Sequence, residues 1–125
     1  MSTLTISNLN DGTTTVPTTY VTNGSAKAFI HYTENGSFSV AKSFNVASEV
    51  DNGNGDISYT LTSAMSDANY ITSGEAGGNL STFYSRITTH IGSTSTVVRM
   101  RSTNSSAYTT QVVFRACSAI FGDLA

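Results

Sequence analysis

The side chains best suited to nucleophilic or acid–base catalysis in this sequence are those of His31, His90 and Cys117, the only histidines and the only cysteine. A catalytic thiol needs a partner that lowers its pKa, usually a histidine, and no histidine lies near Cys117 in the sequence. Cys117 sits in the apolar run VVFRACSAIF, which favours a small buried hydrophobe. Both histidines lie in strand-like segments rich in Thr and Tyr, which is typical of surface or half-buried positions.

The abundance of serine raises the question of a serine hydrolase. Catalytic triads are recognised by geometry, so the sequence alone leaves a Ser–His–Asp arrangement open. The G-x-S-x-G elbow, the P-loop and the dinucleotide-binding glycine fingerprint are all absent. We therefore expect a protein that is not an enzyme, with no catalytic residues and no cofactor.

The segment DNGNGD, residues 51–56, has the composition of a calcium loop or of a tight turn. An EF-hand loop needs oxygen ligands at its third and fifth positions, and a loop starting at Asp51 has Gly53 and Gly55 there. A looser Ca²⁺ site through Asp51 and Asp56 remains an alternative. A Gly/Asn hairpin turn explains the same residues with fewer assumptions, so we expect no metal site.

The charge pattern argues against a nucleic-acid partner. The chain carries 6 Lys and Arg against 8 Asp and Glu, a net charge of −2, and it lacks the basic field that binds a phosphate backbone. Arg99 and Arg101 alternate on one expected strand and so share a face. We also expect no membrane partner, because no stretch approaches the roughly 20 apolar residues of a membrane span.

The composition predicts a folded all-β domain. Nearly every third residue is Ser or Thr and only 11% are charged, yet 38% are hydrophobic, which is too apolar for a disordered chain. Thr, Val, Ile, Tyr and Phe favour strands, and turn signals recur at short intervals. We expect an antiparallel β-sandwich or a jelly-roll-like domain over residues 26–125, preceded by an extended N-terminal arm over residues 1–25.

Alternating apolar residues define the individual strands. In residues 57–62, Ile57, Tyr59 and Leu61 should share one face, and this strand should form a hairpin with 37–50 across 51–56. Asn35-Gly36 is typical of a tight hairpin. The remaining strands are expected over 26–33, 69–73, 80–91, 96–102 and 108–121, with a loop over 74–79; a short helix near 80–90 is the alternative.

The arm has its own pattern. Leu4, Ile6 and Leu9 alternate with polar residues, and the Thr-rich run that follows holds the only proline, Pro17. Proline cannot donate to a strand ladder, which favours a linker with few paired residues. An extended segment of this kind can add to a partner's sheet edge, and we predict that Leu4, Ile6 and Leu9 attach the chain to a larger assembly.

Residues 26–70, AKAFIHYTENGSFSVAKSFNVASEVDNGNGDISYTLTSAMSDANY, resemble a segment of structural proteins from marine tailed phages, including cyanophage-like ones, that are described as tail-fibre-like. The order and spacing of FNV, DNGNGD and DANY carry the resemblance, and the closing AIFGD is similar as well. Phe29, His31 and Lys42 stand where that pattern has Trp, Asn and Arg.

The resemblance implies a virion structural protein on the outside of a bacteriophage particle, assembled in the host cytoplasm. The absence of a signal-peptide pattern at MSTLTISNLN agrees with that expectation. Its partners would be other tail or capsid proteins and further copies of itself, as a homo-oligomer and most simply a homotrimer, with a host surface glycan as a candidate receptor.

Three rival functions stay open on the sequence. A fibre-type, host-recognition component is favoured, and a capsid decoration protein of the cement or head-fibre kind is the alternative. A carbohydrate-binding module unconnected to a phage is less favoured, because the chain has no Trp and no secretion signal pattern.

Overall fold

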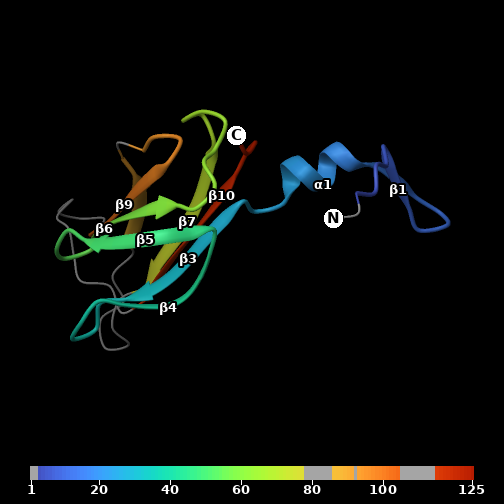
Figure 1. The fold of residues 1–125 in the computed structure, drawn as a ribbon. Coiled ribbons are helices and arrows are strands. Elements are labelled where there is room, and N and C mark those ends of the chain that lie inside the picture. Colours follow the sequence, from blue (N-terminus) through green and yellow to red (C-terminus); the bar gives the residue numbers. More distant parts are fainter. Residues whose placement is uncertain (1–2, 78–85, 92, 105–114) are drawn as a thin grey trace.

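The computed structural model describes residues 3–77, 86–91, 93–104 and 115–125. Over this part of the chain the protein is an antiparallel β-sandwich of two four-stranded sheets, from which the N-terminal segment projects (Figure 1). The predicted all-β sandwich is confirmed. The rest of the fold follows from how the strands are divided between the two sheets.

The first sheet, called the β3 sheet, has the strand order β4-β3-β10-β7. Its strands are β4 (Ser39–Phe44), β3 (Ala28–Thr33), β10 (Arg115–Phe121) and β7 (Ile71–Gly77). The second, called the β6 sheet, has the order β5-β6-β9-β8. Its strands are β5 (Val46–Asp51), β6 (Asp56–Leu61), β9 (Val97–Asn104) and β8 (Arg86–His90).

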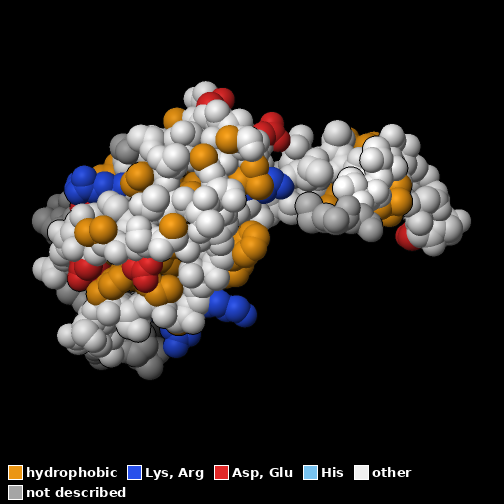
Figure 2. Space-filling model, viewed as in Figure 1, with side chains coloured by type: hydrophobic (Ala, Val, Ile, Leu, Met, Phe, Trp, Pro, Cys, Tyr) orange, Lys and Arg blue, Asp and Glu red, His pale blue; other side chains and the backbone are white. Residues whose placement is uncertain are grey.

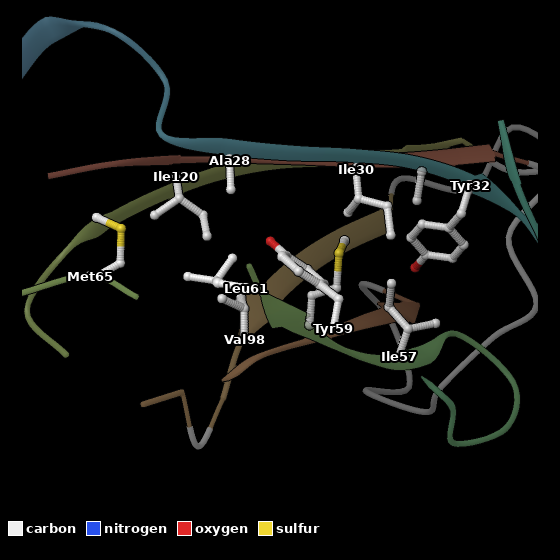
Figure 3. Packing of buried hydrophobic residues seen from close by; sticks show 11 residues of the cluster. Ala28, Ile30, Tyr32, Ile57, Tyr59, Leu61, Met65, Val98 and Ile120 are labelled. Atoms are coloured by element: carbon white, nitrogen blue, oxygen red, sulfur yellow. The ribbon is translucent and has the colours of Figure 1, made fainter. Parts of the chain in front are cut away.

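The core lies between the sheets and is built from the alternating residues of the inner strands. Ile57, Tyr59 and Leu61 are all buried, as the period-two pattern predicts. From the other sheet, β3 contributes the facing side chains (Figure 3): Ala28, Ile30 and Tyr32. Full burial of one large apolar side chain stabilises the fold by roughly 1.5–3 kcal/mol, so these two strands supply much of the folding energy.

A single residue, Asn45, transfers the chain from the β3 sheet to the β6 sheet. The sequence predicts one continuous strand over 37–50, but β4 ends at Phe44 and β5 begins at Val46, each in a different sheet. Asn45 has a φ of 56°, in the left-handed region that Asn tolerates better than most residues. Its amide Nδ2 donates to the Lys27 carbonyl at 3.0 Å and to the Ser63 carbonyl at 3.1 Å, and its Oδ1 accepts from the Ser63 amide at 2.7 Å.

A bulge in β4 reverses which of its side chains face the core. The register shifts where β3 passes from His31 to Tyr32. Before the shift, Val40 packs against the core; after it, Phe44 lies opposite Phe29 on the outer face, with the two ring centroids 5.8 Å apart. An inserted residue has this effect because strand side chains alternate with a period of two.

Other boundaries also differ from those expected. The loop predicted over 74–79 is wrong over 74–77, because β7 continues to Gly77 and pairs with β10, and residues 78–79 lie outside the described part. Of the strand predicted over 80–91, the described part is β8; residues 80–85, and residues 108–114 of the last predicted strand, lie outside the described part. Pairing with the central strand β10 outweighs the two glycines of β7, which by composition alone favour a loop.

The N-terminal segment projects as an arm, but its interior is not extended (Figure 1). It forms a hairpin of β1 (Asn8–Asn10) and β2 (Thr15–Pro17), followed by the helix α1 (Thr18–Gly24), which the sequence did not predict. The Asp11 carboxylate accepts bonds from the Thr13 and Thr14 amides, which folds the turn. Pro17 precedes the first helical residue, where its missing N–H costs nothing.

Asp56 links β6 to the neighbouring strand β9 by binding both arginines of β9. Its carboxylate is buried and accepts hydrogen bonds from Arg99 and Arg101, at 2.8 and 2.7 Å for the closest nitrogen of each. The two arginines share a face, as expected. Their hydrogen bonds lower the pKa of Asp56 to about 2 against an ordinary value of 3.8.

We predict that Asp56 makes the fold sensitive to acid. A carboxyl group with a lowered pKa stabilises the folded state above its ordinary pKa of 3.8, and this contribution is lost as the pH falls towards about 2. The loss should be on the order of 2 kcal/mol, the free energy of a shift of that size. The free energy of unfolding of Asp56→Asn should be lower than wild type at pH 7 and nearly equal at pH 2. Glu49→Gln, an exposed change on β5, is the control; an equal deficit of Asp56→Asn at both pH values would contradict the prediction.

We predict that Asn45→Ala destabilises the protein by about 3 kcal/mol, from three lost hydrogen bonds and an alanine held at positive φ. Asn45→Gly is the matched variant, because glycine loses the same hydrogen bonds without the strain. Urea unfolding should therefore rank wild type above Asn45→Gly and Asn45→Gly above Asn45→Ala. Equal stability of the two variants would mean that the left-handed backbone at this corner stores no strain.

Candidate functional site

Exposed apolar side chains concentrate on the arm. Ten large hydrophobic side chains are exposed over the described residues, and six of them lie within the first 21 residues. Those six are Leu4, Ile6, Leu9, Val16, Tyr20 and Val21. Figure 2 shows hydrophobic side chains along the surface of this projecting segment. Exposed apolar side chains gathered in this way make the arm a candidate interaction site.

The three predicted attachment residues all fall on this surface. Leu4 is 81% exposed, and Ile6 is also exposed in the segment that leads into the hairpin. Leu9 lies in β1 opposite Val16 of β2, so these two side chains form one apolar pair. The arrangement differs from a simple added strand because Leu9 is already paired within the arm.

The helix α1 adds residues that sequence reasoning missed, Tyr20 and Val21. It has seven residues, buries none of them and has no side-chain cap at its N-terminus. Isolated helices of this length are marginal in water, and so is an isolated two-stranded hairpin. Little in the sequence indicated this helix, because the apolar residues of TTYVTNG do not recur with a helical spacing. The helix and hairpin of the arm therefore have little packing of their own to stabilise them.

Lys27 fixes the root of the arm to the sandwich. Its Nζ donates to the Thr22 carbonyl and to Ser25 Oγ, which holds the end of α1. Its backbone N–H donates to the Ile120 carbonyl of β10 at 2.7 Å. Beside this root lies an open pocket of about 510 Å³, which Phe44 and Leu124 border.

A second candidate site is a shallow groove on the outer face of the β3 sheet, which the sequence did not reveal. Two adjoining hollows of about 480 and 370 Å³ share the lining residues His31, Cys117 and Glu75. These three come from neighbouring strands at matching positions, because Cys117 lies opposite His31 on one side and Glu75 on the other. Cys117 is thus half-buried on the outer face and not in the core.

The other histidine belongs to a polar bridge inside the sandwich. His90 Nε2 on β8 lies 2.8 Å from Ser118 Oγ on β10, and Tyr59 OH on β6 lies 2.9 Å from the same oxygen. Burial lowers the pKa of His90 and raises that of Tyr59 to about 12. Ser118 is only 2% exposed, so its hydroxyl cannot meet a substrate, and the Ser–His pair acts as a link between the sheets.

The alternative calcium site through Asp51 and Asp56 does not form. The Asp56 oxygens are bound to the two arginines, and the Asp51 Oδ1 accepts the Gly53 amide within the turn. Within the described ranges, no three His, Cys, Asp or Glu side chains are grouped to hold a metal ion. Over the same ranges, no helix has the length and apolar character needed to cross a membrane.

No protein-family model, no curated protein and no solved structure matches the chain. The resemblance to tailed-phage proteins therefore stays a prediction from the residues that carry it.

We predict that His90 makes stability fall in mild acid. Because burial lowers the pKa of His90, the unfolded chain takes up its proton at a higher pH than the folded one, and stability falls as the pH drops below about 6.5. His90→Gln keeps a polar group near Ser118 and should reduce the loss of unfolding free energy between pH 7.5 and 5.5. His31→Gln, on the outer face, is the matched control and should retain the wild-type loss. An unchanged loss in His90→Gln would refute the assignment.

Proposed function

We propose that this chain is a non-enzymatic structural protein on the exterior of a tailed-phage virion, in which the N-terminal arm attaches to the particle and the β-sandwich is displayed. The observation that carries the proposal is the apolar surface of the arm, which is exposed and has no core of its own. The resemblance of residues 26–70 to fibre-like virion proteins gives the context in which such an arm would find a partner.

Attachment through the arm follows from its energetics. A marginal helix and hairpin gain most of their stability from what they pack against, so binding and ordering of the arm would occur together. The partner surface would be another tail or capsid protein that offers an apolar groove to Leu4 and Ile6 and to the face formed by Leu9 and Val16.

The sandwich suits display at high local concentration. Two of its edge strands, β4 and β5, each carry a bulge and a charged residue, Lys42 and Glu49, which discourage edge-to-edge pairing between copies along these strands. Ser and Thr keep the surface wet with little net charge, which limits repulsion between neighbouring copies.

The fibre-type role and the capsid decoration role differ in where the protein lies on the particle and in how many copies the particle holds. Quantitative mass spectrometry of purified virions measures the copy number relative to the major capsid protein. A few to a few tens of copies would support the fibre-type component, in which we expect a homotrimer. A copy number that equals a simple fraction of the number of capsid proteins would instead support the decoration role. Absence of the protein from the particles would refute the proposal.

We predict that polar substitution of the arm abolishes incorporation into virions. The triple variant Leu4→Ser, Ile6→Ser and Leu9→Ser removes apolar groups that are exposed in the free protein, so its unfolding free energy should stay close to that of the wild type. Its copy number in purified particles should fall at least tenfold. Deletion of residues 2–16 should have the same effect with the sandwich still folded.

The matched control changes apolar residues on the sandwich whose exposure lies within the range of the arm residues. Val50→Ser and Ile71→Ser, which lie on β5 and β7, should leave the copy number unchanged. Normal incorporation of the arm variant, or an equal loss in the control, would exclude the arm as the means of attachment.

A further inference from the structure

The outer face of the β3 sheet carries a row of polar side chains across all four strands. Lys42 of β4 lies opposite His31 of β3, His31 opposite Cys117 of β10, and Cys117 opposite Glu75 of β7. Strands are spaced by about 4.8 Å, so the backbones of His31 and Glu75 are about 10 Å apart with Cys117 between them. A hydrogen-bonding ligand could therefore contact both groups at once while it lies on the strand between them.

An aromatic platform lies beside this row. Phe29 and Phe44 stack with their ring planes 28° apart, and Phe44 is 55% exposed although it is a large apolar side chain. Phe29 also lines the groove together with Ser73. The face thus combines a flat apolar surface with groups that donate and accept hydrogen bonds, including an exposed carboxylate.

The form of the groove indicates an elongated ligand. The two hollows adjoin through the residues they share and together run along β10 from Arg115 to Ala119. Both are open to solvent along their length, and Gly77 of β7, opposite Arg115 on the outer face, has no side chain to raise that border. A chain-like ligand could enter from the side without any movement of the protein.

The charge of the lining favours a ligand with little charge of its own. One carboxylate, Glu75, and one guanidinium, Arg115, line the groove and balance each other. A phosphate backbone would require an excess of positive charge. A protein partner would require a wider apolar surface: among the exposed hydrophobic residues of the described sandwich, Phe44 and Leu124 border one pocket, while Val50 and Ile71 lie singly on β5 and β7.

We propose that this groove, together with the Phe44 ring stacked on its lining residue Phe29, binds a carbohydrate chain, with the two rings packing against a sugar ring and Glu75 and His31 binding its hydroxyl groups. Amphipathic sugar rings match this lining because their C–H faces pack on aromatic rings while their hydroxyls bond to polar side chains. The inference rests on the proposed function, since it assigns host-glycan recognition to the displayed sandwich while the arm attaches to the particle.

The test is binding of the purified full-length protein to an array of oligosaccharides from bacterial lipopolysaccharides and capsules. Wild type should bind a small subset of the printed glycans. Phe44→Ala and Glu75→Gln should each weaken that binding at least tenfold, because one removes the stacking surface and the other the carboxylate charge. Both positions are exposed, so circular dichroism and thermal unfolding should match those of the wild type.

Two matched variants lie on β5 of the other sheet. Val50 has the same 55% exposure as Phe44, and Glu49 is exposed as Glu75 is, so Val50→Ala and Glu49→Gln should bind like wild type. The proposal is overturned if wild type binds no glycan, as it would with a protein receptor, if either groove variant keeps wild-type binding, or if the β5 variants lose it equally. The groove variants should still enter virions and the arm variant should still bind the array, so failure of this inference is distinguishable from failure of the attachment proposal.

Discussion

The fold depends on a change of sheet that takes place within one residue. A sandwich needs a strand to leave one sheet and enter the other, and between β4 and β5 the only residue available is Asn45. Its left-handed backbone makes the sharp corner, while its side chain bonds to Lys27 before β3 and to Ser63 after β6. Through Lys27, the same corner is joined to the end of α1, so the arm leaves the sandwich where the two sheets are tied together.

Two clusters of polar side chains connect elements of the sandwich. Ser118 receives Tyr59 and His90 from the opposite sheet, and Asp56 holds two arginines on the adjacent strand. Buried polar groups without such partners would cost on the order of 1–3 kcal/mol each. The two clusters fix the alignment of the sheets and strands, which apolar packing alone specifies less sharply.

Period-two alternation was enough to predict the inner strands, because Ile57, Tyr59 and Leu61 have one face to bury. It failed over 37–50, where the alternation of Phe38 and Val40 resumes in the sequence at Phe44. A bulge in β4 and the change of sheet at Asn45 alter which way the later residues face. Neither the bulge nor the change of sheet can be recognised in the local sequence, because both are determined by pairing with strands that are distant in the sequence. The helix α1 was missed for the opposite reason, because its residues bury nothing and so show no pattern.

The same limit applies to the two candidate sites. The exposure of Leu4, Ile6 and Leu9 could be predicted because a short, mostly polar segment has no core in which to bury them, while their role in attachment stays a prediction. The groove could not, because His31, Glu75 and Cys117 are far apart in sequence and become neighbours only when β3, β7 and β10 pair. The arm presents apolar groups that lack a core, and the sheet face presents mixed polar and aromatic groups that the core does not use. Surfaces with such different chemistry suit two different partners, so we infer that the molecule connects one partner to another.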